Sequence, residues 1–317
     1  MKKVLLIILF VLPLLADEEE TEDINFEKLP VPWFTGPLIA PSGYTVKPGH
    51  ISVQSNLDLF VTTGLYDSEW KNISTPNLYS QRLRIRIKAG ATSWLDVHIT
   101  PIFGFKETEG QTSFGCFDFP LGLSFQLLTS EIENPWPALR LIVRTLVPCG
   151  KYQKLKPGRL GTDAFGNGCW YPEIAIVSSK LWHLGKEHYL EIRFYSGYRV
   201  GVPTSVKGLS VYGGDASTRG TSYPGNIFFA DLAFEYNMTQ NWALASDIYY
   251  YHRNRSRFSG RSKIPVGLPS SEGFSIAPAL EYNFSKEVGL IGGVWFSYLG
   301  RNYPKFANGI LSLNAYF

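Results

Sequence analysis

Cations recur at every second position in one short stretch of the chain. They alternate there with the apolar residues Leu83, Ile85, Ile87 and Ala89. The cations are Arg82, Arg84, Arg86 and Lys88. Successive side chains of a β-strand point to opposite faces, so the stretch predicts a strand with four cations on one face. Such a face can line a passage or take part in a network of internal ion pairs.

Two further polar side chains are expected beside this row. Asp96 and His98 alternate with apolar residues in the next segment. If the two segments form a hairpin centred on Thr92, Lys88 lies opposite Asp96 and Arg86 lies opposite His98. Both pairs then point the same way, so the register is self-consistent.

Carboxylates dominate another pair of segments. A hairpin centred on Thr239 would place Asp231 opposite Asp247, with Glu235 beside them. Carboxylates so placed repel each other unless a cation lies between them or one of them keeps a proton. In a ring of twelve strands these acids lie across the lumen from the cations. This predicts either a transverse field in an open lumen or ion pairs that fill it. The side chains expected to line the interior are Arg82, Arg84, Arg86, Lys88, Asp96, His98, Arg144, Arg193, Asp231, Glu235, Asp247 and Glu281.

The elements that must hold these side chains are strands with the same alternation of polar and apolar residues. About twelve such segments follow residue 51, each close to the roughly 9–11 residues that a tilted membrane strand needs. Their approximate centres are Leu57, Ile85, Ile99, Leu123, Val143, Ile176, Phe194, Leu232, Leu244, Leu280, Val294 and Leu311. The predicted fold class is an all-β transmembrane antiparallel β-barrel of about twelve strands.

The connections between these segments alternate in length. Long polar stretches cover residues 66–77, 106–116, 148–169, 201–225 and 254–273, and the links between them are shorter. Membrane barrels have long external loops and short periplasmic turns, whereas a soluble β-sandwich has no reason to sort its loops in this way. Aromatic residues near strand ends fit girdles at the two membrane surfaces, among them Trp94, Trp182, Trp242, Tyr282, Phe284, Tyr298 and Tyr316.

The first fifty residues are expected to precede the barrel strands. Lys2 and Lys3, followed by an apolar stretch, predict a signal peptide over residues 1–16. Residues 17–50 form an arm that begins acidic and then carries five prolines, which exclude regular strands and helices. The arm either lies in the periplasm or folds into the barrel as a plug. The barrel is expected over residues 51–317, and its last strand ends at Phe317, where the barrel assembly machinery would recognise it.

Composition excludes other classes. Hydrophobic residues make up 44% of the chain and charged residues 18%, which is too apolar for a disordered protein. The net charge of +3 is too small a bias to argue for nucleic-acid binding. A secreted soluble β-protein stays as an alternative, which recovery in the outer-membrane fraction of a Gram-negative-type bacterium would exclude.

Three cysteines, Cys116, Cys149 and Cys169, fall at the expected external ends of strands. An exported protein can keep a disulfide, and Cys149 with Cys169 brackets one loop and could close it. Cys116 and Cys149 have opposite parities, which disfavours that pair, and the absence of any intramolecular bond stays open because the count is odd. The chain has no Cys-x-x-Cys or clustered histidines, so we expect no metal site and no cofactor.

One trace of acyl-transfer chemistry is present. His252 is followed by Asn254 and Ser256 near the expected outer rim. No complete set of nucleophile, base and orienting group can be assembled around it, so we predict no enzymatic activity.

Several stretches resemble the outer-membrane family named for a putative meta-pathway of phenol degradation. Residues 117–123 (FDFPLGL) resemble its Gly-Asp then Leu-Gly strand start, with Phe117 in place of glycine. Residues 147–151 (VPCGK) resemble its Leu-Pro-Thr-Gly strand end, with Cys149 in place of threonine, and Gly166-Asn167-Gly168 resembles its glycine-rich return. The resemblance covers roughly Leu83 to the C-terminus. It implies an outer-membrane barrel that passes small aromatic or apolar compounds.

The leading expectation is passive passage of small molecules across the outer membrane, with membrane lipid and small solutes as partners. The competing expectation is a structural or surface-interaction barrel with a filled lumen and its function in the loops. Conductance in a lipid bilayer separates the two.

Overall fold

The computed structural model describes residues 32–317, and all of its regular elements but one short turn are strands. The signal peptide expected over residues 1–16, and residues 17–31 of the expected arm, lie outside the described residues. Within residues 32–317 no helix is long and apolar enough to cross a membrane.

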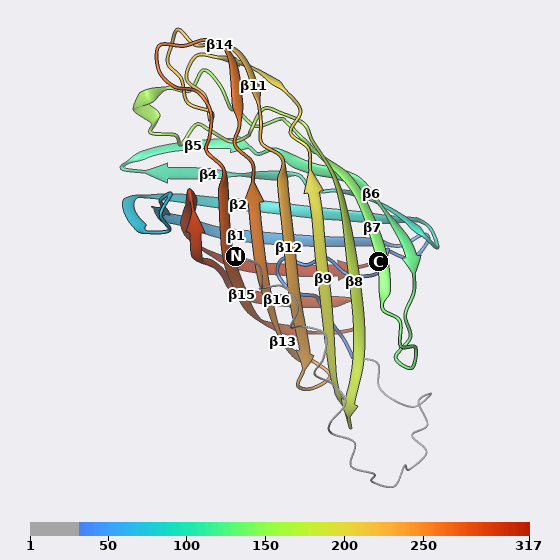
Figure 1. Ribbon diagram of the computed structural model, residues 1–317. Coiled ribbons are helices and arrows are strands. Elements are labelled where there is room, and N and C mark those ends of the chain that lie inside the picture. The colour runs from blue at the N-terminus through green and yellow to red at the C-terminus, as the bar shows by residue number, and fades with distance from the viewer. Residues whose placement is uncertain (1–31) are drawn as a thin grey trace, which may run out of the picture. The chain divides into compact units, whose positions relative to one another are not determined.

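Twelve antiparallel strand positions, here called staves, close into a barrel (Figure 1). Two staves are interrupted and consist of two strands each. In ring order the staves are β1 (Ile51–Tyr66), β2 (Asn72–Thr92), β3 with β4 (Leu95–Ile99 and Ile102–Thr108), β5 with β6 (Gln111–Cys116 and Phe119–Leu128), β7 (Ala138–Val147), β8 (Tyr171–Gly185), β9 (His188–Arg199), β12 (Ile227–Asn237), β13 (Trp242–Arg253), β15 (Ser271–Asn283), β16 (Val288–Arg301) and β17 (Tyr303–Tyr316). The ring closes because β1 pairs with both β17 and β2.

The sequence pattern placed the staves correctly. Each of the twelve expected strand centres lies within a stave, and the fold class is confirmed. The alternation works because one face of every strand is apolar and points outward, while the other carries polar groups that need partners inside.

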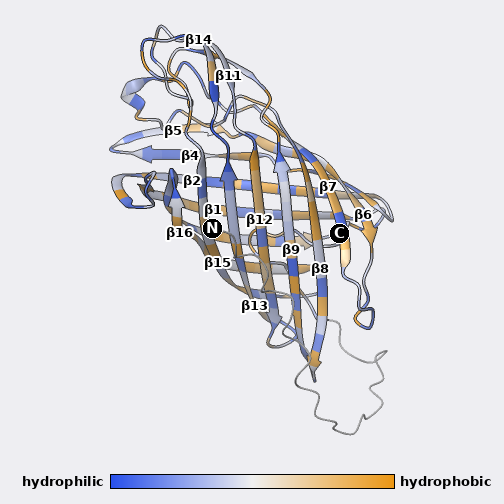
Figure 2. Ribbon diagram, viewed as in Figure 1, coloured by the Kyte–Doolittle hydropathy of each residue, from blue (hydrophilic) through white to orange (hydrophobic). Residues whose placement is uncertain are grey.

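Hydrophobic and hydrophilic residues follow one another along the barrel strands (Figure 2), and many of the large apolar side chains are exposed. On β8, Ile174 and Ile176 are 57% and 36% exposed, whereas Glu173 and Ala175 between and beside them are buried. Leucines of β1, β2 and β17 are exposed in the same way, among them Leu57, Leu59, Leu83, Leu311 and Leu313. Apolar side chains presented on every stave of a closed barrel are what a lipid-facing surface requires, because closure leaves no unpaired strand edge in the bilayer.

The hairpin of β2 and β3 differs in register from the expectation. Lys88 lies opposite His98, not opposite Asp96, because the chain turns at Ser93 and Trp94, beyond the expected centre at Thr92. The expected pairing of Arg86 with His98 is therefore wrong as well. The shift is two residues, so every side chain stays on the face that the pattern assigned to it.

The hairpin of β12 and β13 is also shifted by two residues. Asp231 lies opposite Tyr249, and Asp247 lies opposite Ala233. The turn is longer than expected, since Asn237 and Ala243 are its innermost paired residues. The two aspartates are therefore diagonal neighbours on the inner face, not a directly opposed pair.

One end of the barrel, here the loop end, carries most of the chain outside the staves. A second sheet of three strands lies there (Figure 1), made of β10 (Thr204–Lys207), β11 (Arg219–Tyr223) and β14 (Arg257–Arg261). A single 3-10 turn, η2 (Pro157–Arg159), lies in the connection before β8. Two of the expected long loops are mostly strand: β2 begins at Asn72, and β4 and β5 are joined by the turn at Glu109 and Gly110. The opposite end, here the turn end, has the shorter connections.

Candidate channel lumen

Part of the chain that precedes the first strand lies inside the barrel. Residues 33–47, here the inner segment, bond to inward-facing side chains of several staves on opposite sides of the ring. Six of its backbone N–H groups donate to four carboxylates, at N···O distances from 2.8 to 3.3 Å. The acceptors are Asp96 on β3, Glu235 on β12, Asp247 on β13 and Glu281 on β15. The inner segment is therefore fixed by charge-assisted hydrogen bonds, which are stronger than neutral ones.

Over residues 35–41 of the inner segment, every backbone N–H group has an acceptor, and the prolines add no N–H to satisfy. From Thr35 to Ala40, every residue that has a backbone N–H donates it to a carboxylate. Pro37 and Pro41 have no N–H to satisfy. Asp247 alone accepts the three consecutive groups of residues 38–40. The barrel interior therefore satisfies each donor of this stretch, as buried backbone requires.

Glycines make the close approach feasible. Gly36 has φ of +98°, a conformation that side chains with a Cβ rarely adopt, and its N–H donates to Glu235 Oε1 at 3.0 Å. On β16, a Cβ added at Gly289 would overlap the hydroxyl of Thr35, and one added at Gly293 would lie 2.8 Å from Leu38. Small residues on the inner wall thus leave the space that the segment occupies.

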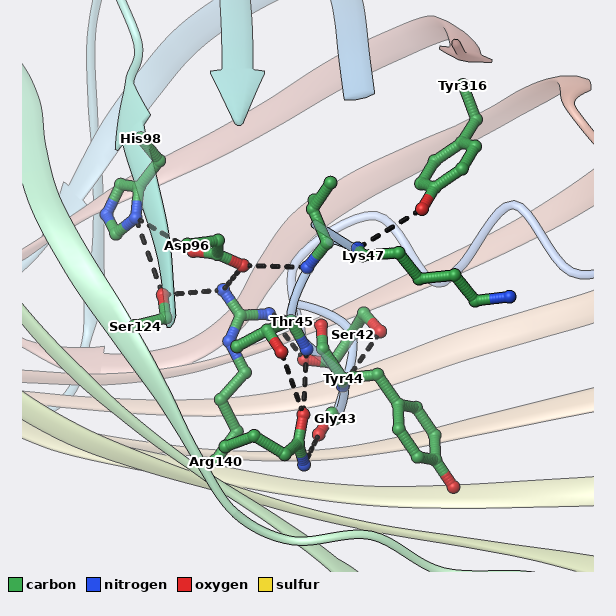
Figure 3. Close-up of polar contacts among 12 residues, drawn as sticks. Ser42, Gly43, Tyr44, Thr45, Lys47, Asp96, His98, Ser124, Arg140 and Tyr316 are labelled. Atoms are coloured by element: carbon green, nitrogen blue, oxygen red, sulfur yellow. Dashed lines mark hydrogen bonds and ion pairs between the residues drawn. The ribbon is translucent and has the colours of Figure 1, made fainter. Parts of the chain in front are cut away.

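Arg140 on β7 holds the second half of the inner segment (Figure 3). Its Nη1 donates to the carbonyl oxygens of Ser42 and Tyr44 at 2.8 and 3.1 Å. Its Nη2 donates to Ser124 Oγ at 2.7 Å and lies 3.6 Å from Asp96 Oδ2. Because Asp96 also accepts the N–H of Val46 at 3.1 Å, one buried ion pair secures both the carbonyl and the amide side of the segment.

The wall away from the inner segment is braced by ion pairs between neighbouring staves. Arg84 forms a two-pronged contact with Asp58, and Asn308 donates to the same carboxylate at 3.0 Å. Glu173 accepts from Arg144 at 2.8 Å and also from Arg199.

On the far side, Arg193 bridges Glu191 and Glu235 at 2.6 and 2.7 Å. Each of these pairs is buried or nearly so, so removing one partner would leave an uncompensated charge.

The expected interior residues divide into two groups in the structure. Four expected carboxylates are bonded to the inner segment and line none of the cavities described below, namely Asp96, Glu235, Asp247 and Glu281. Several cations, in contrast, border open space, namely Arg82, Arg84, Arg86, Lys88, Arg144 and Arg193. Asp231 is 1% exposed, and neither carboxylate oxygen has a hydrogen-bond partner among the described residues.

Five interior residues were missed: Asp58, Arg140, Glu173, Glu191 and Arg199. A signal for four of them was present, since Glu191 and Arg199 have the same parity as Arg193 in β9. Arg140 has the same parity as Arg144 in one strand, and Asp58 sits among the polar residues of β1. Nothing local marked Glu173, because its neighbours on the same face of β8, Ala175 and Val177, are apolar.

Three cavities follow one another through the barrel. The loop-end cavity, of about 540 Å³, is lined by Arg82, Ile102 and several aromatic side chains. The middle cavity, of about 180 Å³, shares Ile102 with it. The turn-end cavity, of about 660 Å³, shares Pro41, Arg86 and Lys88 with the middle cavity. The shared residues make the cavities neighbours, and the middle one is the smallest.

The cysteines do not pair as expected. Cys116 Sγ lies 3.0 Å from Cys149 Sγ, whereas Cys169 is buried and accepts from the hydroxyl of Tyr212 at 3.5 Å. All three cysteines are free in this structure, and the loop closure that Cys149 and Cys169 could make is not formed. The opposite parities of Cys116 and Cys149 had disfavoured contact between them. The two thiols nevertheless meet, because β5 ends at Cys116 and the alternation of side chains is interrupted before β6 begins.

We expect a disulfide between Cys116 and Cys149 when the protein is exposed to a thiol-oxidising envelope. Burial, and then the neighbouring Cys116 thiol, raises the pKa of Cys149 to about 12. Since the thiolate is the attacking species, oxidation of the folded protein in air should be slow and should quicken at high pH. Peptide mapping after alkylation without reductant checks this. Recovery of the linked Cys116 and Cys149 peptides is expected, with Cys169 alkylated only after unfolding; a Cys149–Cys169 peptide would contradict it.

His252 and Ser256 do not form the nucleophile–base pair that acyl transfer needs. His252 Nε2 is 3.1 Å from Asn254 Oδ1, and its Nδ1 is 3.8 Å from Glu272. Ser256 Oγ accepts the N–H of Leu268 at 2.6 Å instead of meeting the imidazole. Within residues 32–317, no group of three or more His, Cys, Asp or Glu side chains could hold a metal ion.

No family model and no curated protein matches the chain. Among solved structures it is similar to the COG4313 outer membrane channel from Pseudomonas putida F1, with a TM-score of 0.68 and 15% identity over 88% of this chain and 100% of that one. Looser likenesses are to the NanC porin (TM-score 0.44, 9% identity, 84% and 98% covered) and to the TodX monoaromatic hydrocarbon channel deltaS2 mutant (TM-score 0.36, 11% identity, 87% and 90% covered). The chain therefore has the barrel fold of the COG4313 outer membrane channel.

Proposed function

We propose that this protein is a passive channel for small molecules in the outer membrane. The observation that carries the proposal is the series of three neighbouring cavities through a closed barrel. A barrel of this size can be filled or open, and here the wall side chains and the inner segment leave cavities that share lining residues. The apolar outer surface supports placement in a bilayer, and the loop end then faces outward, as in other membrane barrels.

In this proposal the inner segment is a plug that narrows the passage without closing it. Ile39 and Pro41 border the middle cavity, directly facing the space lined by Arg84 and Arg86. The segment is held on one side of the lumen by Asp247, Glu235 and Glu281. Residues 35–40 bond to that side, and the middle cavity lies on the other side of them, along the wall that carries Arg84 and Arg86.

The loop-end cavity supports solutes with aromatic or apolar bodies. Its aromatic lining consists of Phe60, Phe117, Phe165, Trp295, Tyr303 and Phe306. This agrees with what the resemblance to the phenol meta-pathway family implies. The COG4313 protein is itself described as an outer membrane channel.

Single-channel recording in a planar bilayer tests the proposal. Purified, heat-modifiable protein should give discrete, small current steps, because the middle cavity holds only about 180 Å³. The competing function is a structural or surface-interaction barrel with a filled lumen. It would give no steps above the background of the lipid, while the protein still fractionates with the outer membrane.

We also propose that β17 is the strand recognised by the barrel assembly machinery. Phe317 exchanges two backbone hydrogen bonds with Ile51, at 2.8 and 3.0 Å, where the ring closes. Loss of the Phe317 aromatic ring should then slow insertion into the membrane without changing the folded barrel. Insertion at the wild-type rate would contradict this.

A further inference from the structure

The cations along the route have few acids to neutralise them. The middle cavity is lined by six formally charged cations, and among residues 32–317 no aspartate or glutamate lines it. These cations are Arg84, Arg86, Lys88, Arg140, Arg144 and Arg199. The carboxylates behind this wall that pair with them are Asp58, Asp96 and Glu173. Three acids offset at most three of the six, so the cavity keeps an excess of positive charge.

Arg86 and Lys88 carry most of that excess, and they lie where the middle and turn-end cavities meet. The one side-chain hydrogen bond of Arg86 within residues 32–317 goes to the neutral Gln54 Oε1, at 3.1 Å. Lys88 Nζ has no hydrogen bond or ion pair to any residue in that range, and Asp96 attracts it only at longer range. Donors of this kind, exposed to a passage and without a protein acceptor, are suited to an anion in transit.

The loop-end cavity adds aromatic faces to the same charge. The Arg82 guanidinium lies 4.7 Å from the centre of the Phe60 ring and 5.6 Å from that of Phe117. Its Nε is buried and has no acceptor within the described part of the chain. Lys106 Nζ lies 5.5 and 5.6 Å from the Phe117 and Phe165 rings.

Asp118, an acid in this lining, has its oxygens taken by the N–H groups of Gly150 and Asn167, at 2.9 and 2.6 Å. The loop-end cavity therefore offers aromatic surface next to two cations, Arg82 and Lys106, that have no carboxylate partner within residues 32–317.

The inner segment covers the acidic side of the lumen, so most of the charged groups that border the cavities are cations. Its amides are bonded to Glu235, Asp247 and Glu281, which the sequence placed across the lumen from the row of cations. Those acids are buried against the segment, so a permeating solute meets the cationic wall without the acidic one. A transverse field between two exposed walls is thereby replaced by a positive passage.

We infer that the channel selects small organic anions, with an aromatic or apolar body and a single carboxylate or sulfonate. This inference rests on the proposed channel function. Arg82 and Lys106 with their aromatic neighbours would receive the ring and the charge at the loop end. Arg86 and Lys88 would pass the charge from the middle cavity to the turn-end cavity.

Zero-current potentials in planar bilayers test the inference. Under a gradient of KCl, the wild-type channel should favour chloride over potassium. When benzenesulfonate replaces chloride on one side, it should still carry current, whereas benzyltrimethylammonium, with the same ring and the opposite charge, should not. Benzenesulfonate stays charged at any working pH, so leakage of a neutral acid through the lipid does not confuse the result.

Two variants locate the selectivity. The double substitution R86E/K88E should lower the chloride-to-potassium permeability ratio at least about tenfold, because four units of charge change beside the passage. The neutral double substitution R86Q/K88M should bring the chloride-to-potassium ratio toward unity. It provides a second test if the charge-reversed variant does not fold. Lys186→Glu, in the exposed turn between β8 and β9 and absent from the lining of all three cavities, is the matched control and should leave the ratio unchanged.

The outcomes separate this inference from the proposed function. Conduction without ion preference, or with a preference for potassium, would overturn the inference but not the proposed channel function. Passage of chloride but not of benzenesulfonate overturns the organic-anion class. The absence of any current overturns the channel function itself, and with it this inference.

Discussion

Asp247→Ala is expected to release the middle of the inner segment and to raise the single-channel conductance. The Asp247 carboxylate accepts three consecutive backbone N–H groups of the segment, at 3.1, 3.3 and 2.9 Å. Hydrogen bonds to a charged group contribute roughly 1.5–3 kcal/mol each. Losing them should shift the balance between bound and released segment by about a hundredfold or more, even after water replaces part of the loss.

The matched control is Asp231→Ala, on the neighbouring strand and the same inner face. Asp231 is as buried as Asp247, but it makes no hydrogen bond to the segment. Its removal should leave the conductance near that of the wild type. Equal conductance of the Asp247 and Asp231 variants would show that the segment does not limit the passage.

Glu173→Leu is expected to destabilise the barrel by about 3–5 kcal/mol, the cost of leaving a buried charge unpaired. Glu173 is buried and pairs with Arg144 and Arg199 from the two neighbouring strands, and it also accepts from the hydroxyl of Tyr195 at 3.3 Å. Without it, two guanidinium groups face each other across the inner wall. Urea unfolding in lipid vesicles, or the temperature at which the heat-modifiable band shifts, measures the loss.

The control for this variant is Glu272→Leu. Glu272 pairs with Arg301 at 2.7 Å, and the Arg301 side chain is 38% exposed. The Glu272 side chain is 17% exposed, against 1% for that of Glu173, so Glu272→Leu should lose less stability than Glu173→Leu. If Glu173→Leu is no more destabilised than Glu272→Leu, the ion pairs of the inner wall are not what braces the barrel.

The strands could be predicted because their signal is local. On every stave, lipid outside and polar partners inside impose a two-residue period, and a shift of register by two residues preserves it. This is why Lys88 and Asp231 were placed on the correct face but opposite the wrong neighbours. The length of each turn depends on contacts that no short stretch reveals. At the end of β12, for example, the Asn237 side chain reaches the carbonyl oxygens of Glu187 and Thr239.

The position of the inner segment could not be predicted from local patterns. Its donors are backbone amides, which every sequence has, and their partners lie about 50 to 250 residues further along the chain. One indirect signal was present. Asp231, Glu235, Asp247 and Glu281 give the inner faces of β12, β13 and β15 four acids and no arginine or lysine below the rim. Such an excess of buried acid needs donors from elsewhere.

Modification of a single cysteine inside the route tests most directly whether solutes pass through the three cavities. Ile102→Cys, in a Cys116→Ser/Cys149→Ser background, would place a thiol where the loop-end and middle cavities meet. Phe103→Cys is the matched control, because Phe103 is the next residue on β4 and is 42% exposed on the outer face. Both would be treated with a sulfonated methanethiosulfonate during single-channel recording, and labelling would be verified by mass. The proposal predicts that modification at residue 102 sharply reduces the current, whereas modification at 103 does not. An unchanged current through a channel fully labelled at residue 102 would contradict it.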